Sequence, residues 1–228
     1  MEFKDIQLSE NETYFVWEGK KLWGKTFLKV MKFHSPGLAP VQDETGGYHI
    51  NTDGFPIYTE RYKRVFGFYC HRAAVLDFEN NCYPIDELGK RISPENYAWC
   101  GNFQENMCTV KDFFGNYFHI DVFGKRIYKE DYKYAGDFRE GIACVMKDSN
   151  KFTHITKTGD LLHGKYFNDL GVYHKGFATA KDSISWFHID KLGNPLYSNR
   201  YAVLEPFYNG VAFAQDFDGK KVWVYDDF

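Results

Sequence analysis

The sequence predicts an all-β protein built as a tandem array of short β repeats. Three observations lead to this prediction: a phrase that recurs about every 35 residues, short strand-like segments within each repeat, and no segment with the period of a long helix. The 228 residues include 22 Phe, 17 Tyr and 5 Trp. Disordered chains are poor in aromatic residues, so we expect a folded chain with a real hydrophobic core.

The first mark of the repeat is the phrase Phe-His-Ile-Asp-x-x-Gly. It occurs at residues 118–124 and again at 187–193, with weaker copies elsewhere. Its isoleucines are Ile50, Ile85, Ile120, Ile155 and Ile189, which are 35, 35, 35 and 34 residues apart. The glycines at which the units step are Gly19, Gly54, Gly89, Gly124, Gly159 and Gly193.

Two further marks run in the same register. One is an aromatic residue shortly before a Gly, His or Asn and a small-x-small strand, as in residues 138–145. The other is one aromatic residue per unit: Phe27, Tyr62, Tyr97, Tyr132, Tyr166 and Tyr201. Three marks in one register predict a single β-repeat domain over residues 1–228, with a partial last unit at 205–228.

Within a unit we expect three short strands joined by tight turns. Residues 141–147 form the first, a short apolar segment that a turn rich in Asp, Ser and Asn follows. Residues 151–156 alternate in polarity and form the second, and residues 125–129 represent the third, after the repeat glycine. The connection to the next unit has room for one helical turn, as at 94–97 or 129–132. This predicts six complete units and a partial seventh, with no helix longer than about two turns.

A 35-residue unit of three strands cannot bury both of its faces alone, so neighbouring units are expected to share a core. We count seven strands of the second kind but only six of the third. A closed, propeller-like toroid needs its strands to divide evenly among the blades, so these numbers favour an open twisted solenoid. The last unit ends with Trp223 and Tyr225 and has no polar cap. We therefore expect this chain to be part of a larger protein.

The repeat resembles the bacterial WG β-repeat family. That family's pattern is roughly aromatic-x-(Glu/Asn)-Gly-(Leu/Ile)-Ala-x-Val, a turn, and then Trp-Gly-Tyr-Ile-Asp-x-x-Gly. Residues 138–145 match the first half, and residues 117–124 and 186–193 match the second. The Trp-Gly dipeptide is replaced by Tyr-Phe or Trp-Phe, which makes this a divergent subgroup. The resemblance implies an interaction module, sometimes fused to enzymatic domains, and it supplies no catalytic residue.

Charge and cysteine content exclude several classes of function. The chain has 28 Lys and Arg against 31 Asp and Glu, so it has no electrostatic footprint for nucleic acid or an anionic membrane. It has no secretory signal and no apolar stretch of about 18 residues. An odd number of cysteines without a CxxC pair argues against disulfides and structural zinc and favours the reducing cytoplasm. The cysteines are Cys70, Cys82, Cys100, Cys108 and Cys144.

Histidine occupies one repeat position in four units, at His49, His119, His154 and His188. These residues alternate with the core isoleucines, so we expect them on the opposite, more exposed face of each sheet. The main interpretation is structural, and the alternative is a contact surface. A metal site does not fit, because equivalent residues of stacked strands lie ~5 or ~10 Å apart, whereas metal ligands lie about 2 Å from one ion.

Two other groups of residues allow a structural and a functional interpretation. A recurring aspartate follows the first strand of each unit, at Asp43, Asp77, Asp112, Asp148, Asp182 and Asp216. We interpret these residues as Asx turns rather than acid-base catalysts. The tryptophans Trp17, Trp23, Trp99, Trp186 and Trp223 fall at different repeat positions. This favours core packing of the aromatic residues over a repeated ligand platform, which stays the alternative.

The sequence therefore predicts a non-enzymatic interaction module with a protein partner and no cofactor. No GxSxG, HExxH or paired CxxC motif is present to carry catalysis. One alternative is a domain that binds a glycan or another small ligand through surface aromatic residues. The other is an accessory domain of a fused enzyme.

Overall fold

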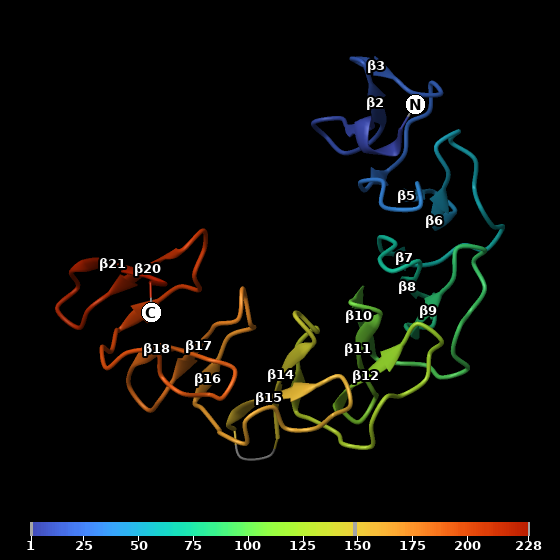
Figure 1. The fold of residues 1–228 in the computed structure, drawn as a ribbon. Coiled ribbons are helices and arrows are strands. Elements are labelled where there is room, and N and C mark those ends of the chain that lie inside the picture. Colours follow the sequence, from blue (N-terminus) through green and yellow to red (C-terminus); the bar gives the residue numbers. More distant parts are fainter. Residues whose placement is uncertain (1, 148–149, 228) are drawn as a thin grey trace. The chain divides into compact units, whose positions relative to one another are not determined.

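The computed structural model describes residues 2–147 and 150–227, and it confirms an all-β fold of tandem repeats. The strands form seven antiparallel sheets of three strands each, and every sheet is made of strands that are consecutive in the chain (Figure 1). Within the described residues the only helical element is the short 3-10 helix η1 (Phe3–Asp5). In this part of the chain, no helix has the length and apolar character needed to cross a membrane.

The first four sheets have the following bounds: β1 (Gln7–Leu8), β2 (Phe15–Trp17) and β3 (Lys20–Lys21); β4 (Lys29–Val30), β5 (Ala39–Asp43) and β6 (Gly46–Ile50); β7 (Arg64–Val65), β8 (Ala73–Leu76) and β9 (Cys82–Ile85); β10 (Trp99–Gln104), β11 (Met107–Lys111) and β12 (Tyr117–Asp121). The last three sheets have these bounds: β13 (Tyr134–Ala135), β14 (Ile142–Met146) and β15 (Phe152–Thr156); β16 (Asp169–Leu170), β17 (Ala178–Lys181) and β18 (Trp186–Ile189); β19 (Val203–Leu204), β20 (Val211–Gln215) and β21 (Lys221–Tyr225).

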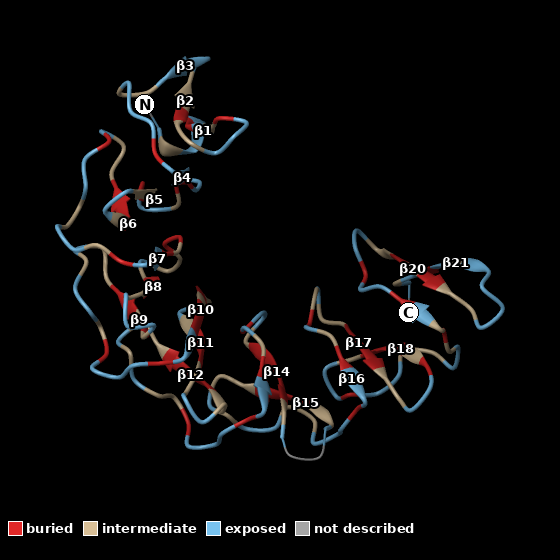
Figure 2. Ribbon diagram, turned by 180° about the vertical axis from the view of Figure 1, so that it is seen from behind, coloured by how far each residue is buried: buried red, intermediate tan, exposed pale blue. Residues whose placement is uncertain are grey.

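The chain divides into two compact units. The first comprises Met1–Gly115 with His119–Arg126, and the second comprises Asn116–Phe118 with Ile127–Phe228. In both units the buried residues lie mainly on the strands, and the turns between strands are exposed (Figure 2). Each unit therefore has a core of its own, made where its sheets face one another.

The two longer strands of each repeat form where the sequence predicts them. In the fifth sheet, β14 and β15 pair antiparallel over five residue pairs, from Ile142 opposite Thr156 to Met146 opposite Phe152. The marker isoleucines of five repeats are fully buried, as the alternation of polarity predicts. They are Ile50, Ile85, Ile120, Ile155 and Ile189.

The third strand forms where the sequence predicts it only in the first sheet, where β3 directly follows Gly19. Residues 125–129 form no strand, and Arg126 makes a single bridge to Ile120. The chain then runs to Tyr132, which bridges Tyr117 at the other end of β12. The edge of β12 is thus covered at both ends rather than along its length, so no continuous ladder forms.

The strand that completes each later sheet comes from the segment after the recurring aromatic residue. In the fifth sheet this strand is β13, which pairs with β14. With this strand included, every sheet has three strands. The last sheet, β19–β20–β21, is therefore complete, although the sequence predicted only a partial unit at 205–228. Residues 94–97 and 129–132 form no helical turn.

In the second to sixth sheets the recurring aromatic residue is buried and pairs with the sheet edge. Tyr62, Tyr97, Tyr132, Phe167 and Tyr201 make this bridge. Phe27 of the first unit is buried too, and its backbone N–H donates to the carbonyl of Thr13 (2.8 Å). In the fifth repeat the sequence prediction of Tyr166 is wrong, because Phe167 forms the bridge and Tyr166 is 48% exposed. Phe167 lies 35 residues after Tyr132, in step with the repeat. The step of 34 residues is therefore the next one, from Phe167 to Tyr201.

The recurring aspartates hold the turns, as predicted. The Asp77 Oδ1 atom accepts hydrogen bonds from the backbone N–H groups of Glu79 (2.9 Å) and Asn81 (2.8 Å). Equivalent bonds at the same kind of turn are made by Asp43, Asp112, Asp182 and Asp216. Asp148 lies outside the described residues. The Asp of the Ile-Asp-x-x-Gly phrase does the same at the second turn, as Asp121 shows with Phe123 and Lys125 (2.9 Å each).

The repeat glycine is required for backbone geometry and for close packing. Gly89 has φ +77°, and a Cβ atom built there would lie 2.4 Å from the Cδ1 atom of Tyr58 in the preceding repeat. A left-handed conformation is unfavourable for residues with a Cβ atom, and the ring of Tyr58 leaves no space for one.

Gly89→Ala is expected to destabilise the protein more than Gly115→Ala, which serves as its control. Gly115 has φ +90° but open space around its Cβ position. Gly115→Ala therefore carries only the backbone cost of about 1 kcal/mol, whereas Gly89→Ala adds overpacking and should reach about 2–4 kcal/mol. Urea unfolding measures both values, and equal losses would contradict the close approach of the repeats.

Candidate interaction surfaces

The four recurring histidines are fully buried, so their predicted exposure is wrong. His49, His119, His154 and His188 have no accessible surface and cannot form the expected contact surface. Alternation does place them on the face opposite the isoleucines. At His49, His154 and His188 that face is covered as well, because the following repeat packs on it, and a stacked repeat is therefore buried on both faces.

His49, His154 and His188 each link their strand to the next repeat. On β18, the His188 Nε2–H group donates to the backbone carbonyl of Glu205 (2.9 Å), and Nδ1 accepts from the Tyr197 hydroxyl (2.6 Å). His49 has the same arrangement with the Phe66 carbonyl and the Tyr58 hydroxyl. A carbonyl can only accept a hydrogen bond, so the proton lies on Nε2 in the neutral ring.

In the fifth repeat a second histidine replaces the tyrosine. His154 Nε2–H donates to the Gly171 carbonyl (2.9 Å), and its Nδ1 accepts from His163 Nε2–H (3.1 Å). His163 Nδ1 in turn accepts from the backbone N–H of Lys165 (3.1 Å). Every ring nitrogen in this chain of bonds has a partner of the correct polarity when both rings are neutral.

Burial lowers the pKa of His49, His154 and His188 to about 4, so these side chains are neutral at pH 7. They hold the structure together and take no part in a surface. A regular spacing in the sequence marks the partners of these histidines. The side chain that bonds Nδ1 lies nine residues after the histidine, and the carbonyl that accepts from Nε2–H lies seventeen residues after it, as in the bonds of His188.

Other recurring chemical groups are also occupied by the fold. The recurring aspartates that the structure describes accept turn hydrogen bonds. The five cysteines are free. Burial raises the pKa of the Cys144 thiol to about 12, so this residue is not a thiolate near pH 7. Among the described residues no three His, Cys, Asp or Glu side chains are grouped so that they could hold a metal ion.

Most recurring aromatic residues belong to the core, as the main interpretation predicts. The aromatic residues of the small-x-small phrase are all buried: Phe33, Phe68, Phe103, Phe138, Tyr173 and Phe207. Trp17, Trp23 and Trp186 are half-buried, while Trp99 and Trp223 are exposed. The exposed aromatic residues are thus a separate set from those that fill the core.

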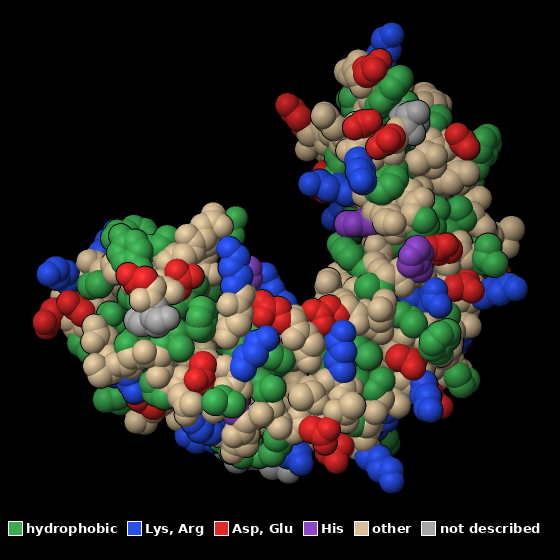
Figure 3. Space-filling view, in the orientation of Figure 1, with side chains coloured by type: hydrophobic (Ala, Val, Ile, Leu, Met, Phe, Trp, Pro, Cys, Tyr) green, Lys and Arg blue, Asp and Glu red, His purple; other side chains and the backbone are tan. Residues whose placement is uncertain are grey.

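The first compact unit exposes large apolar side chains at its turns. Phe113 and Phe114 at the β11–β12 turn are 61% and 90% exposed, and Phe78 is exposed at the equivalent β8–β9 turn. Leu88 and Phe123 are exposed at the Asp-x-x-Gly turns. We call these five residues the apolar turn tips. On the surface, hydrophobic side chains lie among the charged ones (Figure 3).

The same unit contains a cavity of about 320 Å³ between its second and third sheets. Lys29 and Arg64 are its charged residues, and no acidic side chain lines it. The remaining lining residues are Met31, Pro40, Val41, Gln42, Val65 and Phe66.

The second unit has a shallow, open hollow of about 560 Å³ lined by aromatic rings. The rings of His174 and Tyr208 are nearly parallel, with an interplanar angle of 14° and centroids 6.5 Å apart. The Arg139 guanidinium donates to His174 Nδ1 (2.8 Å). Glu205, Val172, Pro206 and Phe207 complete the lining.

One repeat of the chain matches a known family. Residues 120–151 match the model of the WG containing repeat. This match confirms the resemblance found from the repeat phrases. Curated proteins give no match to the sequence.

Solved structures give weak similarities over much of the chain. BamB from Moraxella catarrhalis aligns with 98% of this chain and 80% of its own, at 11% identity and a TM-score of 0.48. The computationally designed Ika4 protein aligns with 54% of this chain and 87% of its own, at 14% identity and a TM-score of 0.38. These scores are too low to support a functional comparison.

The buried histidines predict that the protein loses stability when the pH falls from about 6.5 towards 4. An unfolded histidine binds a proton near pH 6.5, whereas His49, His154 and His188 resist protonation down to a pKa of about 4. Their contribution is complete above pH 6.5 and decreases by about 3 kcal/mol per histidine at pH 4. Free energies of unfolding at pH 7, 5.5 and 4.5 measure this loss. Constant stability over this range would contradict the neutral, buried rings.

Proposed function

We propose that this chain, an array of β repeats of the WG type, is a non-enzymatic module that binds a protein partner. The observation that supports this most directly is the set of apolar turn tips in the first compact unit. Large apolar side chains that remain exposed outside a filled core are typical of interaction sites.

The turn tips are free for recognition because other atoms hold the turns. Asp112 accepts the N–H of Phe114, and Asp121 accepts the N–H of Phe123, so neither aromatic side chain is needed for its turn. Equivalent turns of stacked sheets lie ~10 Å apart. Phe78 therefore forms one row with Phe113 and Phe114 before the second long strand, and Leu88 forms another with Phe123 after it. A row of aromatic side chains with that spacing suits the flat, apolar surface of a protein partner.

The structural roles of the recurring histidines and aspartates also favour binding over catalysis. The recurring histidines and aspartates are the residue types from which active sites are made. Here the histidines are buried in hydrogen bonds between repeats, and the described aspartates hold turns. A binding function needs none of them.

Phe113→Ser combined with Phe114→Ser is expected to reduce capture of a partner at least about tenfold, since exposed aromatic anchors dominate such interfaces. Affinity capture from lysate with quantitative mass spectrometry compares the double variant with the unchanged chain. Phe217→Ser is the matched control, because Phe217 is an exposed phenylalanine at the equivalent turn of the last sheet. Equal capture by the double variant, with an unchanged circular dichroism spectrum, would contradict this surface.

A second candidate function is binding of a carbohydrate or another small polar ligand in the hollow of the second unit. The parallel rings of His174 and Tyr208 provide an apolar platform, and Arg139 and Glu205 provide hydrogen-bonding groups beside it. Sites for small ligands combine apolar surfaces with a few polar groups in this way.

Tyr208→Ala is expected to abolish ligand signals in saturation-transfer NMR with a panel of oligosaccharides, because it removes half of the platform. Tyr225→Ala is the control, since Tyr225 is an exposed tyrosine outside the hollow. If no saccharide gives a signal with the unchanged chain, or if both variants behave alike, this candidate function is excluded.

A further inference from the structure

Two cations occupy the same repeat position in neighbouring sheets of the first unit. Lys29 is the first residue of β4 and Arg64 is the first residue of β7, and the two lie 35 residues apart, in step with the repeat. A cation at this position occurs only in the second and third sheets, so the repeat fold does not require it. The first strands of the other sheets begin with Gln7, Trp99, Tyr134, Asp169 and Val203.

The same two sheets carry large apolar side chains two residues further along the chain, at Met31 and Phe66. Side chains two residues apart in an extended chain lie on the same side of it. Both pairs of residues line the cavity between the second and third sheets. The next three repeats have glycine where these sheets have Met31 and Phe66, at Gly101, Gly136 and Gly171. The cations and the large apolar walls therefore occur together, in one place in the array.

The lining of this cavity favours a ligand that accepts hydrogen bonds. Two of its backbone carbonyls already have donors: the Pro40 carbonyl accepts from Met31 N–H (3.0 Å), and the Phe66 carbonyl accepts from His49 Nε2–H (2.7 Å). No acidic side chain lines the cavity, whereas both of its charged side chains are cations. The lining is therefore complementary to a negative charge and unfavourable for a positive one.

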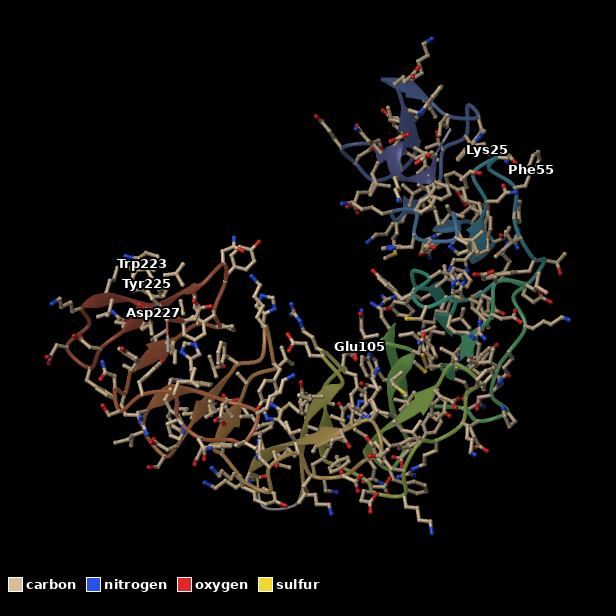
Figure 4. The ribbon with its side chains drawn as sticks, in the orientation of Figure 1. Lys25, Phe55, Glu105, Trp223, Tyr225 and Asp227 are labelled. Atoms are coloured by element: carbon tan, nitrogen blue, oxygen red, sulfur yellow. The ribbon has the colours of Figure 1, made fainter. Side chains whose placement is uncertain are left out.

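The protein itself does not pair the two cations at the cavity. Within residues 2–147 and 150–227, Lys29 and Arg64 make no ion pair and no side-chain hydrogen bond. Lys25 of the same unit is by contrast occupied, because its Nζ atom donates to the Gly54 carbonyl (2.8 Å) and lies 5.5 Å from the centroid of the Phe55 ring. Figure 4 shows Lys25 and Phe55 side by side. Lys29 and Arg64 are thus available to an anion.

We propose that this cavity binds a small carboxylate with an apolar body. The carboxylate pairs with Lys29 and Arg64, and the apolar body packs against Met31, Val41 and Phe66. A phosphate ester carries up to two charges and loses more hydration between apolar walls, so a carboxylate is the better fit. The site goes beyond the proposed partner binding, because it uses none of the apolar turn tips.

The volume of the cavity sets the size of the ligand. An apolar cavity of about 150 Å³ holds one benzene molecule. The cavity of about 320 Å³ is roughly twice as large. It therefore suits a ligand of about a dozen non-hydrogen atoms, such as a monocarboxylate with one aromatic ring or a medium-length alkyl chain.

Isothermal titration calorimetry of the full chain tests the class of ligand. Phenylbutyrate and decanoate match the cavity in size and should bind, more tightly at low salt. Phenylbutanol and phenylbutylamine have the same apolar body without the negative charge and should bind at least about tenfold more weakly. The proposal is overturned if neither carboxylate binds at millimolar concentration, if the alcohol binds as tightly as the carboxylate, or if phenyl phosphate binds more tightly than both carboxylates.

Variants of the two cations test the site itself. Lys29→Gln and Arg64→Gln should each weaken phenylbutyrate binding about fivefold, and the double variant at least about tenfold. Lys29→Arg and Arg64→Lys keep the charge and should stay within about threefold of the original affinity. Lys90→Gln is the matched control, because Lys90 is an exposed lysine of the same unit outside the cavity. A double variant that binds like the unchanged chain, or like Lys90→Gln, overturns the proposal.

NMR of the methionine methyl groups locates the ligand without any substitution. Phenylbutyrate should shift the methyl signal of Met31, which lines the cavity, and leave that of Met107, which lies on β11 outside it. A shift at Met107 without one at Met31 overturns the location. Circular dichroism shows whether each variant folds, and the methyl signals decide the question where a variant does not.

Discussion

Each sheet in this protein has only three short strands, and every other feature of the structure depends on that limit. Such a sheet buries too little apolar surface to be stable alone, so each repeat must use its neighbour to cover both a face and an edge. The isoleucines fill one face, and the histidines hold the other to the next repeat through paired hydrogen bonds. The bridging aromatic residue then covers the edge of the second long strand. Stability therefore arises between repeats more than within them.

The same limit explains why polar residues with catalytic potential have structural roles. A buried imidazole is tolerated only when both nitrogens have partners, and the repeat supplies a hydroxyl or second imidazole on one side and a carbonyl on the other. Where the fold uses this arrangement, the histidine is neutral and inaccessible. The stacking leaves other side chains exposed, among them the turn tips and Trp223 and Tyr225 of the last sheet.

The residues that hold each turn are different from the residues that the turn exposes to solvent. Aspartate oxygens and glycines with positive φ hold the turns, so the residues between them are free to vary. In the third and fourth sheets these free positions carry phenylalanine and leucine. In the last sheet the position of the buried histidine carries tryptophan. One repeat can therefore support different surfaces in different units without a change in its core.

The sequence by itself determined the period, the two long strands of each repeat, the buried isoleucines and the aspartate-held turns. These features are local, because they follow from spacing, alternation of polarity and turn chemistry within about 35 residues. Only the tertiary structure decided that the histidine face is buried, that Phe167 rather than Tyr166 covers its edge, and that residues 125–129 form one bridge instead of a strand. Alternation shows that two faces exist, but whether the second face meets solvent depends on the repeat that packs against it. That packing partner lies beyond the local pattern, so the burial of His49, His119, His154 and His188 could be established only from the assembled fold.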